Sequence, residues 1–316
     1  MIIYGAGLAG LLAGNMMRSF NPMIKEAQKS LPNNHGALLR FRSDKVETAT
    51  AVPFKKVRVR KAIKHDGKII TTPNLMLSNM YSQKVTGSVL DRSINNLDEV
   101  DRYIAPWHLI KEMAKNCSIE YERKLDRRSL EEMHDWEPHR PIISTLPMPV
   151  LMKIVGWDEI PDFPKQKIWT QKVKIMDPDC QVCQTIYYPD PLIKHYRVSL
   201  IGDTLISEFT EKPDTNIGVH AMDVLSEDFG IRSYKIDDMK ESEQEYGKIM
   251  PIDDRLRKEF IFQMTNKYNI YSVGRFATWR QLLLDDVVGD LKVVEQFIRG
   301  GTDYARWVHS QKGENQ

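Results

Sequence analysis

Cysteine, long apolar runs and an excess of charge of one sign are all scarce in this 316-residue chain. Only Cys117, Cys180 and Cys183 occur, and so small and odd a number excludes a disulfide scaffold and favours a reducing compartment. No run of 18 apolar residues is present, which argues against a membrane-spanning helix. Because 45 basic residues face 43 acidic ones, any site for a polyanion has to be local.

The sparse thiols also limit the metal and redox chemistry that the chain can support. Cys180 and Cys183 have the spacing of redox and zinc sites, but no second pair of ligands accompanies them. We therefore expect two ordinary thiols in or beside a strand, and no metal site. The chain enters an apolar strand without a preceding cationic segment, so we expect no signal peptide and a cytoplasmic protein.

What the chain does contain is typical of a soluble globular protein with about two domains. Hydrophobic residues make up 41% and charged residues 28% of the sequence. At about 150 residues per domain, the length predicts two units with ample cores. The composition leaves the oligomeric state open.

The first 26 residues carry a nucleotide-binding pattern. An apolar strand over residues 1–4 leads into Gly5-Ala6-Gly7-Leu8-Ala9-Gly10, an apolar helix, and a second strand that ends at Glu26. In this pattern the first glycine permits a tight turn, the second lets a pyrophosphate approach the backbone, and the third lets the helix pack on the strand. The helix N-terminus favours the diphosphate, and the carboxylate would bind ribose hydroxyls and disfavour a 2′-phosphate.

The two ends of the chain together resemble one superfamily. Gly14 extends the first motif to GxGxxGxxxG, a form that resembles FAD-binding proteins more than NAD dehydrogenases. Near the other end, a strand over residues 268–273 precedes Gly274 and Arg275, then Trp279, then two acids that lead into a helix through about residue 299. This arrangement resembles the FAD-dependent superfamily that contains UDP-galactopyranose mutase, protoporphyrinogen oxidase and the flavin amine oxidases.

The resemblance implies an α/β fold: a Rossmann-like FAD-binding domain of the glutathione-reductase and amine-oxidase type, with an inserted sheet-rich substrate domain. It implies a discontinuous FAD domain over residues 1–48, 100–155 and 246–316, and a substrate domain over 49–99 and 156–245. Apolar spacing predicts a helix over residues 104–116 and another over 219–229. Alternation predicts strands over 118–122, 167–175, 184–188, 196–200 and 204–209.

The same resemblance assigns the expected FAD ligands. The family's second glycine-rich element is replaced here by a segment with His35, Arg40 and Arg42, which could take its place near the flavin or diphosphate. The start of the last helix would direct its positive end at the flavin. The full set of expected FAD-binding residues is Gly5, Ala6, Gly7, Leu8, Ala9, Gly10, Glu26, Ala27, His35, Arg40, Arg42, Leu125, Ser144, Thr145, Gly274, Arg275, Asp285, Asp286 and Val287.

On the substrate side, the expected catalytic residues are Tyr188, His195, Arg197, Trp279 and Lys56. Aromatic side chains could cage an amine, Arg197 could hold a carboxylate or phosphate, and a lysine could position water beside the flavin. Plain strand packing explains the tyrosines equally well. Residues 55–64 contain six bases and no acid, which predicts either a solvated strand face or a surface for a polyanion such as DNA.

These features favour an FAD-dependent oxidoreductase, amine-oxidase-like, that oxidises a C–N bond of an amine or amino-acid-like substrate. The segment over residues 38–42 resembles phage-encoded members, which makes an amino-acid-modified thymine base in DNA a candidate substrate. A non-redox flavin-dependent mutase acting on a nucleotide sugar is the alternative, and a non-catalytic flavin-binding module is a third.

Overall fold

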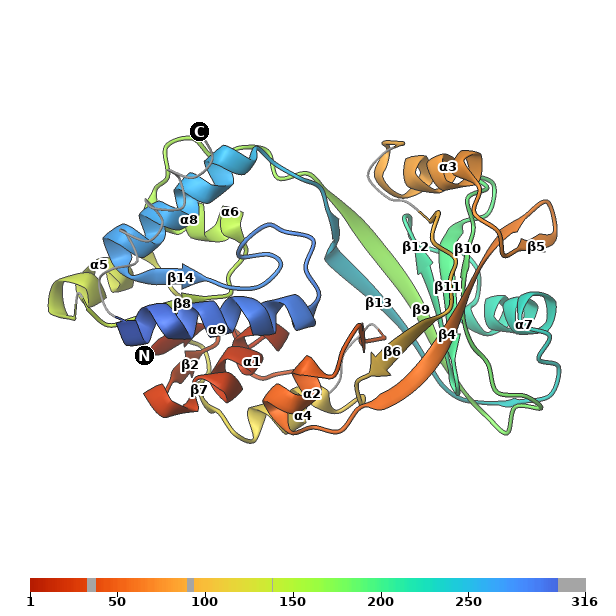
Figure 1. Cartoon of the computed structure of the whole chain (residues 1–316), viewed down its shortest axis with the longest axis horizontal. Helices are drawn as coiled ribbons and strands as arrows, with labels where there is room; N and C mark the ends of the chain where they lie inside the picture. The colour runs from red at the N-terminus through yellow and green to blue at the C-terminus, as the bar shows by residue number, and fades with distance from the viewer. Residues whose placement is uncertain (33–37, 90–93, 138, 301–316) are drawn as a thin grey trace.

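The computed structural model describes residues 1–32, 38–89, 94–137 and 139–300 and contains two sheets in two lobes (Figure 1). Within the described residues, the smaller sheet is parallel, and its strands β14, β8, β1, β2 and β7 lie in that order. Their bounds are Ile270–Ser272, Ile142–Ser144, Ile2–Tyr4, Met23–Lys25 and Ser118–Glu120. This sheet therefore gathers segments from both ends and the middle of the chain.

Helices cover both faces of the smaller sheet, because alternate side chains of β1 face opposite cores. Ile3 belongs to one hydrophobic cluster, and Ile2 and Tyr4 belong to another. The first cluster is formed with α1 (Leu8–Met16), α2 (Lys45–Thr50), α4 (Leu109–Ala114) and α9 (Leu284–Gly300). The second is formed with α5 (Arg127–Trp136), α6 (Met148–Val155) and α8 (Asp254–Tyr268).

The larger sheet makes the second lobe, and among the described residues its main path runs β13-β9-β12-β11-β10-β4-β6-β3, with β5 paired to β4. The pairs are antiparallel except for β10 with β4, which is parallel. Helix α7 (Ile217–Asp228) packs on one face of this sheet. Helix α3 (Leu75–Thr86) forms a separate hydrophobic cluster with residues of β11 and β4. In the order of that path, from β13 to β3, the strand bounds are Lys235–Ile249, Lys165–Met176, Thr204–Phe209, His195–Ile201, Cys183–Tyr187, Lys55–His65, Val100–Ile104 and Arg40–Phe41. Strand β5 is Lys68–Ile70.

The long strands β9 and β13 link the two lobes (Figure 1). Ile249, at the end of β13, is buried in the cluster under α8, so the larger sheet is anchored in the first lobe. No helix among the described residues has the length and apolarity that crossing a bilayer requires.

The α/β fold with a second, sheet-rich unit is as expected, but two local expectations are corrected. Residues 104–116 are not one helix: Ile104 ends β6, and α4 begins at Leu109. Pro106 explains the break, since the residue before a proline is disfavoured in helical conformation. In addition, β3 and β6 belong to the larger sheet, although residues 1–48 and 100–155 were expected in the FAD domain.

Candidate active site

The glycine-rich turn between β1 and α1 can close only with glycine at two positions. Gly5 has φ +94°, a backbone conformation that side chains disfavour. A Cβ on Gly10 would lie 1.8 Å from the carbonyl oxygen of Gly5, so the turn itself excludes a side chain there. The close approach of helix and strand occurs instead at Gly14, whose Cβ would lie 2.8 Å from the side chains of Ile24 and Cys117.

Gly7 differs from these glycines because it faces open space. It caps α1 with φ −70° and ψ −178°, which any residue can adopt, and a Cβ there would meet no atom within 4 Å. The first N–H groups of a helix have no partners within it, and they carry partial positive charge. The start of α1 therefore offers donors and room for an anionic group beside Gly7.

Glu26 lies against this turn. Its carboxylate accepts hydrogen bonds from the N–H of Ala6 at 2.7 Å and of Gln28 at 2.9 Å. Ala27 follows at the exposed surface. The acid that ends β2 is thus within reach of a ribose whose phosphate sits at the start of α1.

The end of β8 forms the other side of the turn. The Thr145 hydroxyl donates to the carbonyl oxygen of Tyr4 at 2.9 Å, and a Cβ on Gly5 would lie 2.5 Å from that hydroxyl. Ser144 is fully buried in β8. Leu125, in contrast, packs in the hydrophobic cluster with Tyr4, so its side chain contributes to the core.

The C-terminal motif reaches the same turn. Gly274 has φ +97°, and a Cβ on it would lie 2.8 Å from the Cβ of Ala9 in α1. The guanidinium of Arg275 lies 3.5 Å from the carbonyl oxygen of Gly247 in β13. The Gly274-Arg275 pair therefore joins the glycine-rich turn to the strand that connects the lobes.

The first turn of α9 binds the segment that contains Arg42. Asp285 is 4% exposed and accepts from the N–H of Arg42 at 2.7 Å and from the hydroxyl of Ser43 at 3.0 Å. Asp286 accepts from the N–H of Leu283 and lies 3.6 Å from the Arg42 guanidinium. Val287 of α9 is buried in the core of the first lobe. His35 lies outside the described residues.

Three arginines from different strands lie near one another on the larger sheet. Arg40 of β3 donates to the hydroxyls of Thr185 at 2.6 Å and Ser199 at 3.2 Å. Arg197 of β11 makes a two-pronged ion pair with Glu208 of β12, with 2.7 Å between Nη2 and Oε1. Arg102 of β6 donates to the carbonyl oxygen of Asp101.

The charges of these groups also act on one another. Burial is the largest cause that lowers the pKa of Arg40, and the positive charge of Arg197 is the next. Burial opposes ionisation of Glu208, but Arg197, Lys248 and Arg40 outweigh it and lower the pKa of that carboxyl to about 2. The sequence motifs did not single out Arg102, Glu208 or Lys248, because only the folded sheet brings them to Arg40.

Two expected catalytic residues, His195 and Tyr188, lie on the opposite face of the larger sheet. His195 contacts the rings of Tyr188, Phe209 and, in α7, His220. Phe209 follows Glu208 directly in β12, and successive side chains of a strand point to opposite faces, so this layer faces away from Arg197. The expectation that His195 and Tyr188 face the substrate together with Arg197 is corrected, because both pack beneath α7.

Trp279 and Lys56 also occupy other places than expected. Trp279 is 3% exposed, packs edge-on against Phe163, and donates its Nε1–H to the carbonyl oxygen of Met250. It is a core residue of the first lobe. The ammonium of Lys56 pairs with Asp101 at 3.1 Å on an exposed face.

The basic strand over residues 55–64 does have one exposed basic face, with Val57 and Val59 buried on the other. Acids of the neighbouring segment neutralise much of it: Arg58 pairs with Glu99 and Asp101, and Arg60 pairs with Glu99 at 2.9 Å. The net field of this face is therefore weaker than the sequence of the strand alone suggests.

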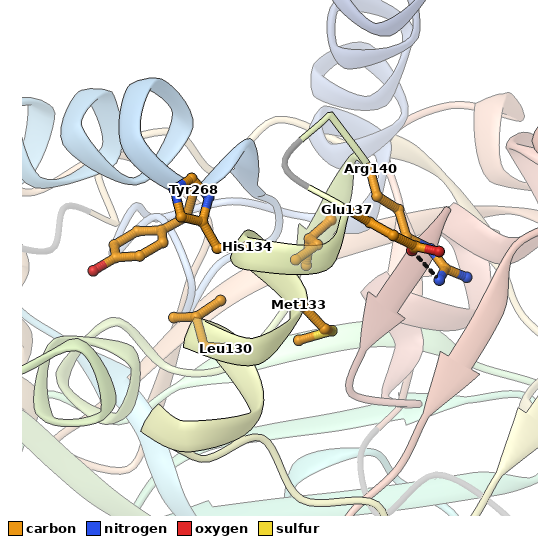
Figure 2. Close-up of a pocket in the computed structure, with 7 residues that line it drawn as sticks. Leu130, Met133, His134, Glu137, Arg140 and Tyr268 are labelled. Carbon is orange, nitrogen blue, oxygen red and sulfur yellow. Dashed lines mark hydrogen bonds and ion pairs between the residues drawn. The ribbon is translucent and has the colours of Figure 1, made fainter.

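A small cavity in the first lobe is too small for a ligand (Figure 2). Its volume is about 10 Å³, which admits one water molecule at most. The side chains that line it come mainly from α5 and its C-terminal end, and they include Leu130, Met133, His134 and Tyr268.

Comparisons with known proteins identify the fold. No protein-family model matches the sequence, and no curated protein matches it. The structure is similar to that of reduced UDP-galactopyranose mutase, with a TM-score of 0.66, 13% identity, and coverage of 95% of this chain and 96% of the other.

Two further solved structures have similar values. A putative protoporphyrinogen oxidase from Exiguobacterium sp. 255-15 gives a TM-score of 0.58 at 12% identity, with 95% and 98% of the two chains covered. A fatty acid isomerase from P. acnes, which produces CLA, gives 0.57 at 13% identity, with 94% and 98% covered. The chain therefore shares the fold of these solved structures, which is the fold that its terminal motifs predict.

Proposed function

We propose that this chain is an FAD-dependent oxidoreductase. The observation that carries the proposal is the meeting of both chain ends at one turn: Gly7 leaves room at the start of α1, Glu26 lies beside it, and Gly274 packs against Ala9. A dinucleotide needs these three features, namely phosphate donors, a ribose acceptor and a close backbone approach. The donor set fits FAD.

The residues that would hold FAD follow from these contacts. The start of α1 beside Gly7 would receive the diphosphate, and Glu26 would accept hydrogen bonds from ribose hydroxyls. Gly274-Arg275 and the first turn of α9 would lie along the rest of the cofactor. When bound, FAD supplies acceptance of a hydride, while the protein supplies orientation and electrostatics.

For the reaction, we propose oxidation of a C–N bond in an amine or amino-acid-like substrate. The carbon beside the nitrogen loses a hydride and the nitrogen loses a proton, which leaves an imine. Water then hydrolyses the imine to a carbonyl compound and an amine, and oxygen or another acceptor takes up the two electrons. An amino-acid-modified thymine base in DNA is a candidate substrate, and the exposed basic face of β4 is the surface that would contact its phosphates.

A mutase acting on a nucleotide sugar is the second candidate. The similarity to reduced UDP-galactopyranose mutase and the arginines on the larger sheet favour it. Such an enzyme needs reduced flavin but no net oxidation of its substrate, so the two candidates differ in their dependence on a reductant.

An anaerobic bleaching screen separates the candidates. The purified protein, or the protein reconstituted with FAD, is expected to be yellow and to lose its flavin absorbance with one class among amines, amino sugars and modified nucleosides. Bleaching by an amine excludes the mutase. Turnover of UDP-galactopyranose only after reduction excludes the oxidase. A colourless protein that takes up no FAD excludes both.

A further inference from the structure

Positive charge is concentrated on the face of the larger sheet opposite α7. Arg40, Arg102 and Arg197 come from three strands, and Lys248 of β13 lies 5.3 Å above the ring of Tyr196. Arg40 of β3 pairs with Ile104 of β6, and Arg102 lies two residues from Ile104, so the side chains of Arg40 and Arg102 point to the same face of the sheet. The charges of Arg197 and Arg102 both lower the pKa of Arg40. Like charges gathered in a partly buried place cost free energy unless an anion joins them.

Within this cluster, the acid Glu208 is already engaged. Its carboxylate accepts two hydrogen bonds from Arg197 and one from the hydroxyl of Tyr196 at 3.0 Å. The Arg197 and Glu208 side chains are 19% and 14% exposed, so the pair is largely shielded from water. Glu208 therefore neutralises the charge of Arg197.

Arg40 and Arg102 have no such partner among the described residues. Arg40 is held by two neutral hydroxyls, those of Thr185 and Ser199, which fix its direction without neutralising it. Arg102 donates to a main-chain carbonyl oxygen, and no described carboxylate forms an ion pair with it. Asp285 also acts on Arg102, but its two oxygens are engaged by Arg42 and Ser43.

These two arginines adjoin the proposed FAD site. Arg40 is two residues from Arg42, whose N–H is bound by Asp285 in the first turn of α9. On the other side, Arg275 lies next to Gly247, the neighbour of Lys248 in β13. Figure 1 shows α9 running away from the larger sheet, so its first turn is the end nearer to that sheet.

We propose that Arg40 and Arg102 together bind an oxyanion of the substrate, a carboxylate or a phosphate ester, and that they orient it toward the proposed FAD site. The inference rests on the proposed function only in naming FAD as the neighbouring cofactor. The anion site is argued from the arginines alone. Guanidinium groups bind carboxylates and phosphates through parallel hydrogen bonds, and the two hydroxyls already aim Arg40. The substrate class is then an anionic one, such as an amino acid or a nucleotide derivative.

Calorimetric titration of the protein as purified tests this inference, with acetate and methyl phosphate as separate probes. Saturable binding of one probe is expected, and the probe that binds identifies the oxyanion. Arg40→Gln and Arg102→Gln should each weaken that binding about 10- to 100-fold, because a charge-assisted hydrogen bond is lost. Arg40→Lys keeps the charge without the fork and should weaken it less.

Arg128→Gln is the matched control, since it removes one exposed positive charge, paired with Glu132, from the first lobe. It should leave the binding of either probe unchanged. Circular dichroism checks folding, and if Arg40→Gln does not fold, Arg102→Gln still decides the question. The inference is overturned if neither probe saturates, or if Arg128→Gln weakens binding as much as Arg102→Gln.

Flavin content distinguishes this result from a failure of the proposed function. A protein that binds no FAD but binds the anion through Arg40 and Arg102 contradicts the proposed function alone. A protein that binds FAD but binds neither probe contradicts the anion site alone.

Discussion

Gly7 is the residue at which fold and ligand binding can be separated by a single substitution. Its backbone conformation and surroundings accept a side chain in the protein without ligand, since no atom lies within 4 Å of its Cβ position. Gly7→Val should therefore fold, but its side chain would occupy the space beside the start of α1. We expect FAD binding to weaken at least about 100-fold, as measured by flavin fluorescence quenching.

Gly289→Ala is the matched control for that substitution. Gly289 also has open space at its Cβ position, but it lies on the exposed side of α9. FAD binding should be unchanged, and the helix should gain about 0.5–1 kcal/mol of stability. Equal FAD affinity in Gly7→Val and in the original protein would show that no phosphate lies at this turn.

Glu208 gives a second prediction at the scale of the residue, because its partner Arg197 is largely shielded from water. Glu208→Gln should lower the free energy of unfolding by about 3 kcal/mol, since it leaves a shielded guanidinium without its counter-charge. Glu99→Gln, which breaks exposed ion pairs of β4, should cost less than about 1 kcal/mol. Denaturation with urea measures both, and equal losses would mean that water screens the Arg197 pair.

At the scale of the element, β11 explains why two sequence predictions were wrong. The register between β11 and β12 shifts between His195 and Arg197, so simple alternation along this strand does not hold. Lys84 of α3 donates to the carbonyl oxygens of Tyr188 and His195, which fixes this stretch of chain beside α3. The sequence shows neither feature, since the lysine lies more than 100 positions away and the bulge depends on how β11 pairs with β12.

The elements at the two chain ends could be predicted, because their signals are local. The strand, turn, helix and acid of residues 2–26 follow one another directly, and glycine is required at Gly5 and Gly10 for reasons of geometry. The arginine cluster could not be predicted, because Arg40, Arg102 and Arg197 lie on three strands that only the sheet order brings together. The sequence shows their charges but not their partners.

The packing of β11 against α7 predicts a pH dependence of stability. Burial is the main cause that lowers the pKa of His195 to about 3, and His220, Lys84 and Lys64 add to it. Burial also lowers the pKa of His220. A histidine with a lowered pKa binds fewer protons in the folded state, so stability is complete above about pH 6.5 and falls as the pH drops below that value.

Because of His195 alone, the free energy of unfolding should therefore be about 2 kcal/mol lower at pH 5 than at pH 7.5. Urea denaturation at pH 7.5 and pH 5 measures the difference. His195→Phe keeps a ring among Tyr188 and Phe209 and should remove most of this loss. His139→Gln, at an exposed position, should keep it. An undiminished loss in His195→Phe would contradict the assignment to His195.

At the scale of the whole molecule, neither lobe is a continuous piece of chain. The smaller sheet takes strands from residues 2–25, 118–144 and 270–272, and the larger sheet takes the segments between them. The strand β13 begins at the outer edge of the larger sheet and ends in the core under α8. Because the chain passes repeatedly between the lobes, we expect them to unfold together.

A cofactor held by both chain ends should therefore stabilise the entire molecule. At a free FAD concentration of one hundred times its dissociation constant, the free energy of unfolding should rise by about 2.7 kcal/mol. Calorimetry should show one transition that moves to higher temperature as FAD is added, and hydrogen exchange should slow in β11 and β12 as well as in β1 and α1. Gly7→Val should show the same single transition without the shift. Two transitions, of which FAD moves only one, would mean that the lobes fold independently despite the strands that join them.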